Sequence, residues 1–287
     1  MTIEAIASPA ADTAVVAPRR FYRHRLPVRV MHWINVVCLT IMLGSGLNIF
    51  NAHPSLYWGH DSMRAPWLSL EARDTPTGPV GRTTLGDYEI ATTGVLGLSK
   101  VDGQLTARGF PSWATIPGSQ WLAMSRHWHL FFAWLFVVNG VAYVLYTVLS
   151  RHLVRDLVPT RAELKHIGRS IVDHVRLKHP TGDAARRYDV LQSLIYLIVI
   201  FVLLPMVVLA GMALSPRLDS VITGWADIFG GRQSARSIHF LAALGLVLFV
   251  VIHVAEVFIA GVWNEMRSIV TGWYVLPADH AKEEAKP

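Results

Sequence analysis

The chain has 287 residues, of which 52% are hydrophobic and only 16% are charged, and its mean hydropathy is +0.38. This composition excludes an ordinary soluble domain and indicates a membrane protein. The net charge of +6 does not point to nucleic acid, because the basic residues cluster beside apolar stretches. The single cysteine, Cys38, excludes an intrachain disulfide, and it excludes an iron–sulfur cluster or zinc site built from cysteines of this chain alone.

Four stretches with few or no charges predict four membrane-spanning helices, because about 20 helical residues cross about 30 Å of hydrocarbon. We expect an all-α integral membrane four-helix bundle with a long extracytoplasmic loop between the first two helices. No cleavable secretory signal is evident in residues 1–18, so the first span is expected to be retained. The predicted segments are a cytoplasmic N-terminal segment at 1–26, a first span at 27–52, an extracytoplasmic loop at 53–126, a second span at 127–150, a cytoplasmic loop at 151–188, a third span at 189–214, an extracytoplasmic loop at 215–236, a fourth span at 237–263 and a cytoplasmic tail at 264–287.

Basic residues predict the orientation. The loop at 151–188 is rich in Arg and Lys, whereas residues 51–126 carry equal numbers of basic and acidic side chains. By the positive-inside rule, the N-terminus, the 151–188 loop and the C-terminal tail face the cytoplasm. Five arginines at the start of the first span support the same orientation: Arg19, Arg20, Arg23, Arg25 and Arg29.

The segments between and within the spans carry further signals. The loop at 51–126 is rich in Gly, Pro, Thr and Trp and is expected to be folded, because aromatic residues are scarce in disordered segments. In the 151–188 loop, apolar residues at helical spacing predict a short amphipathic helix on the membrane surface. Pro205 predicts a kink in the third span.

Histidines inside the predicted spans are the main functional signal, because ionisable residues in lipid are costly and usually have a function. On the fourth span, His239 and His253 are 14 residues apart, about 21 Å along one face of a helix. A haem with two axial imidazoles needs a partner for each of them on a facing helix at the same depth. His32 on the first span matches His253, and a histidine on the second span matches His239. The sequence therefore predicts two haem irons, each with two histidine ligands.

The second span offers two histidines, His127 and His129, which lie about 200° apart around a helix, so only one can face the bundle. The face of His129 continues with Gly140 and polar residues, so we choose His129 as the ligand and keep His127 as the alternative. Gly46 lies on nearly the same face as His32. We expect Gly46 and Gly140 to let a flat cofactor pass close to the helices.

Four stretches resemble a known family: "HRLPVRVMHWINVVCLTIMLGSG", "RHWHLFFAWLFVVNGVAYVLY", "YDVLQSLIYLIVIFVLLPMVVLAGMALSP" and "SIHFLAALGLVLFVVIHVAEVFIAGVWNEMRSIVTGWY". They resemble the dihaem b-type cytochromes of the bacterial cytochrome b561 and nickel-iron hydrogenase cytochrome b group, which includes membrane subunits of hydrogenase, formate dehydrogenase and thiosulfate reductase. The resemblance covers about residues 20–274. It implies two haems b, with His32 and His253 binding one iron and His129 and His239 the other, in a multi-pass protein of the bacterial cytoplasmic membrane.

The resemblance also implies electron transfer between quinone, the substrate in the membrane, and an extracytoplasmic redox enzyme. The third and fourth spans favour a molybdopterin oxidoreductase over a nickel-iron hydrogenase as that partner. Glu256, one turn after His253, is our first candidate for a quinone-binding residue, followed by Arg29 and Asn35. A stand-alone superoxide or ferric reductase, and a channel or transporter with structural histidines, are the alternatives. The sequence leaves open whether two copies form a homodimer.

Overall fold

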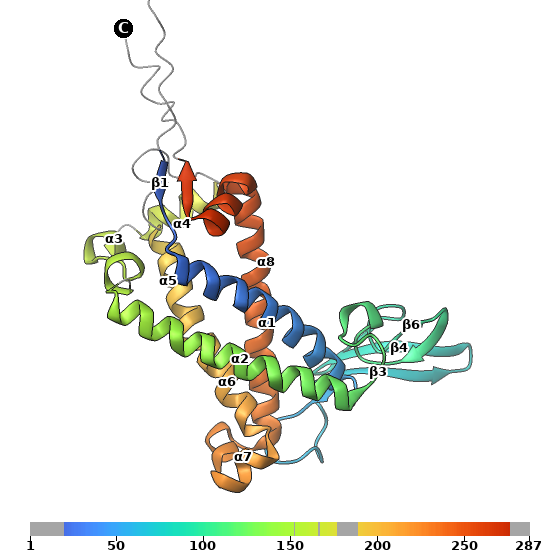
Figure 1. Cartoon of the computed structure of the whole chain (residues 1–287). Coiled ribbons are helices and arrows are strands. Elements are labelled where there is room, and N and C mark those ends of the chain that lie inside the picture. Colours follow the sequence, from blue (N-terminus) through green and yellow to red (C-terminus); the bar gives the residue numbers. More distant parts are fainter. Residues whose placement is uncertain (1–19, 152, 166, 177–188, 276–287) are drawn as a thin grey trace, which may run out of the picture.

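The structure, a computed structural model, describes residues 20–151, 153–165, 167–176 and 189–275 (Figure 1). Four helices in the described chain are long and apolar enough to cross a membrane. They are α1 (Leu26–Phe50), α2 (Leu122–Leu149), the composite helix at Val190–Ala213 and α8 (Arg232–Thr271). The prediction of a multi-pass membrane protein with four spans is confirmed. All four run between two ends of the molecule, which we name by the strands found there: the β1–β8 end and the β2–β5 end.

The spans pack as two pairs. Contacts between helices concentrate where α1 meets α2 and where α6 (Leu204–Ala213) meets α8, while few contacts join α1 to α8. Figure 1 shows α1 and α2 running side by side across the other two spans. The space between the two pairs is bridged mainly by side chains, and this is where the intramembrane histidines lie.

The third span is interrupted before Pro205. It consists of α5 (Val190–Ile198), one π-helical turn (Val199–Leu203) and α6, and Pro205 lies in the first turn of α6. Proline lacks a backbone N–H and its ring crowds the preceding turn, so the wider π turn accommodates the missing hydrogen bond. The predicted irregularity at Pro205 is therefore present, as a π turn.

The all-α prediction is wrong for the long loop between α1 and α2. This loop forms a four-stranded antiparallel sheet in the order β2-β3-β4-β5 and a separate hairpin, β6-β7. Two-residue turns join β3 to β4 and β4 to β5, where Thr75 pairs with Gly78 and Leu85 with Tyr88. The strands are β2 (Ser55–Leu56), β3 (Leu68–Thr75), β4 (Gly78–Leu85), β5 (Tyr88–Ala91), β6 (Leu98–Val101) and β7 (Gln104–Ala107). The loop is folded, as expected, but as β structure.

This β domain is fixed to the ends of α1 and α8. Phe50 at the end of α1 packs with Leu56 and Leu70 in a buried cluster that also contacts Phe240 of α8. Next to it, Ser237 of α8 donates from Oγ to the Tyr57 carbonyl (2.6 Å) and accepts from Trp67 Nε1 (3.0 Å). The domain therefore sits beside the first turns of α8.

At the opposite end, strands close to the two termini form a small sheet. β1 (Arg20–Tyr22) pairs antiparallel with β8 (Trp273–Val275). Arg23 binds both carboxylate oxygens of Glu265 at 3.2 Å and lies over the Tyr274 ring. The remaining short elements are a 3-10 turn at Ser112–Ala114, a π turn at Leu153–Leu157, α3 (Arg161–Lys165), α4 (Ile167–Val175), α7 (Pro216–Val221) and a 3-10 turn at Trp225–Phe229. The helix α4 lies where the amphipathic segment was predicted.

Candidate functional site

Two imidazoles face each other near the β2–β5 end of the bundle. The rings of His129 on α2 and His239 on α8 have centres 6.2 Å apart and planes inclined by 66°. His129 Nδ1 lies 3.1 Å from the Met42 carbonyl and 3.2 Å from Ser45 Oγ, and His239 Nδ1 lies 2.7 Å from the Val207 carbonyl. Because a carbonyl can only accept, Nδ1 carries the proton in both rings. The lone pair of each ring is therefore on Nε2, the nitrogen that is free to bind a metal.

A second pair lies near the β1–β8 end. The ring centres of His32 on α1 and His253 on α8 are 6.4 Å apart, and the ring planes are inclined by 61°. Phe249 stacks on His253 with centres 5.8 Å apart, and Trp33 lies edge-on to His32 at 5.4 Å. His32 Nδ1 is buried and has no hydrogen-bond partner among the described residues. His32 thus differs from His129 and His239, whose Nδ1 atoms lie beside backbone carbonyls.

Glycines of the neighbouring helices lie against the rings of the His129–His239 pair. A Cβ on Gly46 would lie 3.2 Å from Cε1 of His129, and a Cβ on Gly211 would lie 3.0 Å from Cε1 and Nδ1 of His239. At Gly140, no atom lies within 4 Å of the place that a Cβ would take. A Cβ at Gly46 or Gly211 would crowd the neighbouring ring, so glycine favours the close approach of α1 and α6, and the space beside Gly140 on α2 is open.

The spacing of both pairs fits a metal ion held between two imidazoles. Metal–imidazole nitrogen bonds are about 2 Å long, so two rings on opposite sides of one ion have centres about 6.3 Å apart. Within the described parts of the chain, no group of three or more His, Cys, Asp or Glu side chains converges on one point. Each pair could therefore supply two imidazole nitrogens to a metal whose other ligands come from a group such as a porphyrin.

His127 takes no part in either pair. It is exposed on α2, and its Nδ1 lies 3.2 Å from the Ala123 carbonyl of its own helix. Of the two histidines considered on the second span, the structure brings only His129 to His239.

The quinone candidates all lie on the β1–β8 side of the bundle centre. Glu256 is half-buried on α8, one turn beyond His253. The side-chain carbonyl of Asn35 accepts a 2.8 Å hydrogen bond from Asn139 Nδ2, which also donates to the Met31 carbonyl at 2.9 Å. Arg29 donates from Nη2 to the Val270 carbonyl and lies on the outer side of α1.

The sequence did not single out Gly211 and Ser45. Gly211 lies near the end of α6 and His239 near the start of α8, but they are unequal numbers of residues from the 215–231 connection. Counting residues along the two helices therefore does not bring Gly211 to His239. Ser45 precedes Gly46, but its contact with His129 depends on how α1 and α2 pack, and the sequence does not specify this packing.

Two comparisons with known proteins give matches. The family model described as prokaryotic cytochrome b561 matches residues 23–272. A candidate protein-methionine-sulfoxide reductase subunit, YedZ1, from Azospira oryzae is 26% identical over 230 residues, which cover 80% of this chain and 87% of the relative. No solved structure matches.

Proposed function

The chain belongs to the prokaryotic cytochrome b561 family, and on this premise we propose that it is a dihaem electron-transfer subunit that links quinone in the membrane to an extracytoplasmic redox enzyme. Family membership implies haem b. Haem iron supplies the one-electron chemistry, and the protein sets the ligands, the burial and the access of protons.

The observation that carries the proposal is the spacing of the two imidazole pairs, 6.2 Å and 6.4 Å between ring centres. We assign His129 and His239 to one iron and His32 and His253 to the other. The hydrogen bonds from Nδ1 of His129 and His239 to backbone carbonyls hold these rings in place and leave Nε2 free to bind iron. Gly46 and Gly211 make room for the two imidazole rings, and the open space beside Gly140 is available to the flat ring system.

The first test is a haem count on the purified full-length protein. We expect a reduced-minus-oxidised spectrum of b type and two haems per chain, because each pair supplies both axial ligands of one iron. The pyridine haemochrome assay, divided by protein from amino-acid analysis, gives the stoichiometry. One haem per chain would leave a single pair as a site, and a colourless protein would support the channel or transporter alternative.

For the quinone we propose the β1–β8 side of the bundle, with Glu256 as the group that exchanges protons. Reduction or oxidation of a quinone moves protons as well as electrons, so a titratable side chain is needed beside the nearer haem. Glu256 is one helical turn from His253 and is half-buried in an otherwise apolar stretch. Asn35 is the second candidate, since its amide lies one turn beyond His32. Arg29 is the third.

Replacing Glu256 by glutamine is expected to slow quinol-dependent reduction of the haems by about tenfold to 100-fold, because general acid–base groups contribute on that scale. Stopped-flow absorbance with a water-soluble quinol measures this rate. Glu163→Gln, the same change on the short helix α3, is the matched control and should react like the wild type. An unchanged rate in Glu256→Gln, with both haems present, would remove Glu256 from the quinone site.

We propose the β domain as the surface that meets the redox partner. It lies beside the start of α8, and the Trp58 ring, half-exposed, stacks on Trp67 at 5.9 Å. Trp67 in turn bonds to Ser237, two residues before His239. Burial, and then the nearby Arg236 guanidinium, lower the pKa of His53 in this domain below its usual range, so the ring is neutral at pH 7. Exposed apolar side chains on the same domain include Tyr88, Ile90 and Trp113.

The proposed orientation follows from the basic residues, and it places the β domain outside the cytoplasmic membrane of a bacterium. The name of the Azospira oryzae relative connects that protein with methionine sulfoxide reduction. We therefore propose a molybdopterin oxidoreductase as the partner, in preference to a nickel-iron hydrogenase.

Metal analysis of the complex, isolated from its own membrane in mild detergent, tests this assignment. We expect molybdenum, in roughly one-to-one ratio with the chain, to co-purify with it, because a partner that exchanges electrons with the chain must dock close to the outer haem. The double variant Tyr88→Asp, Ile90→Asp should lose the molybdenum and keep both haems. Nickel in place of molybdenum would favour the hydrogenase. Neither metal, with superoxide or ferric reductase activity of the isolated chain, would support a stand-alone enzyme.

A further inference from the structure

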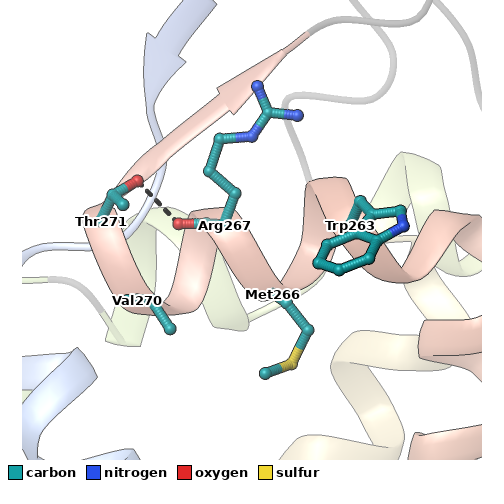
Figure 2. A pocket seen from close by; sticks show the side chains of 5 residues that line it. All are labelled: Trp263, Met266, Arg267, Val270 and Thr271. Atoms are coloured by element: carbon teal, nitrogen blue, oxygen red, sulfur yellow. Dashed lines mark hydrogen bonds between the residues drawn. The ribbon is translucent and has the colours of Figure 1, made fainter.

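The last part of α8 does not continue through the membrane. A helix of 40 residues would be about 60 Å long, twice the hydrocarbon thickness. The backbone breaks at Gly261 (φ 106°, ψ 88°), a conformation that favours glycine, and the following turns run to Thr271 in a different direction. Figure 2 shows Met266 and Val270 on one side of these turns and Arg267 on the other. Trp263, two residues after the break at Gly261, is 84% exposed. This is the pattern of a helix lying in a membrane interface.

Beside this segment, an apolar groove follows α1. It has a volume of about 520 Å³ and is lined by Leu26, Val30, Trp33 and Val37 of α1, together with Val270 of α8. The four α1 residues are spaced four, three and four apart, so they form one stripe on the helix, about 16 Å long. All four are more than a third exposed. The groove therefore opens to the lipid over the depth of roughly one membrane leaflet.

Arg29 is the one charged residue that lines this groove. Its Nη2 is satisfied by the Val270 carbonyl, but its Nε is buried and has no hydrogen-bond partner among the described residues. The nearest described carboxylate on the same segment of α8, Glu265, is bound by Arg23. A guanidinium in an apolar wall needs an anion, and no carboxylate of the described residues forms an ion pair with Arg29.

We propose that this groove holds one anionic phospholipid of the adjoining leaflet, with its phosphate against Arg29 and one acyl chain along the α1 stripe. The phosphate supplies both the negative charge and the oxygen acceptors that the guanidinium requires. Arg25, exposed one turn earlier on α1, adds positive charge at the rim. A neutral quinone ring supplies no charge for Arg29. The lipid site depends on neither the haems nor the quinone.

Native mass spectrometry of the delipidated full-length protein tests the site, with dioleoyl phosphatidylglycerol and dioleoyl phosphatidylcholine as probes of equal chain length. We expect the wild-type protein to bind one molecule of the added phosphatidylglycerol and to bind it in preference to phosphatidylcholine. In Arg29→Gln, the preference should fall by about fivefold, the scale of one arginine beside an anionic lipid. Arg169→Gln, which removes an exposed arginine from α4, is the matched control and should keep the wild-type preference.

A second variant tests the contribution of the apolar groove separately from that of the Arg29 charge. Val30→Trp fills the apolar wall and leaves Arg29 in place, and it is expected to lose the retained lipid while its circular dichroism and thermal unfolding match those of the wild type. Equal binding of the two lipids by the wild type, or full retention in Val30→Trp, would overturn the proposal. Competition by decylubiquinone provides the last outcome: displacement of phosphatidylglycerol at equimolar quinone would assign the groove to quinone, and no displacement supports the lipid.

Discussion

Replacing His239 by alanine is expected to lower the haem content of the purified protein from two per chain to one. His239 faces His129 at 6.2 Å and is fixed by its hydrogen bond to the Val207 carbonyl. If His239 binds iron as proposed, this change removes one of the two imidazole ligands of that iron and opens the site on the α8 side. The His32–His253 pair is one bilayer leaflet away and keeps both of its rings, so the second haem should remain.

The measurement is the haemochrome assay, combined with a redox titration of the reduced band. Wild type should titrate in two steps and His239→Ala in one. His127→Ala is the matched control on α2, because His127 is exposed and bonds only to the Ala123 carbonyl of its own helix in the described structure. It should keep two haems. Loss of a haem in His127→Ala with two retained in His239→Ala would reverse the assignment on the second span.

The spans and the histidine pairing were accessible from sequence because both depend on local periodicity. Apolar length predicts a span, and 14 residues on one helix set the depth and the face of His239 and His253 without tertiary information. The choice of His129 over His127 rested on the small and polar residues that follow on the His129 face. The structure places His127 on the outside of α2, so this geometric expectation agrees with the packing.

The β domain could not be predicted in the same way. Strand prediction relies on alternation of apolar and polar residues, and β4 offers only Val80 and Leu85 as large apolar side chains. Its register is set instead by the short turns that join it to β3 and β5. Likewise, the groove along α1 depends on a contact between residues more than 200 positions apart. The helix α8 breaks at Gly261, and residues after the break line the groove together with α1.

The second large effect is expected from Gly211→Val on α6. A Cβ at this position would already lie 3.0 Å from two atoms of the His239 ring, and valine adds two methyl groups to it. The His239 ring cannot move away, because its Nδ1 is hydrogen-bonded to the Val207 carbonyl, which lies one turn before Gly211 on α6. Overpacking of this kind costs about 1–3 kcal/mol, which corresponds to at least a fivefold weaker hold on the haem between His129 and His239.

Haem retention during dialysis against apomyoglobin, a haem acceptor, measures this effect, and we expect one of the two haems to leave Gly211→Val first. Gly168→Val on α4 is the matched control, since no atom lies within 4 Å of the place that its Cβ would take. The comparison separates two roles for Gly211. If the glycine only allowed α6 and α8 to pack, the variant would unfold at lower temperature and both haems would be lost together. Selective loss of one haem, with the His32–His253 site unchanged in its redox titration, is the result expected if Gly211 positions the His239 imidazole. Retention of both haems as in the wild type would show that His239 does not need its present position to bind iron.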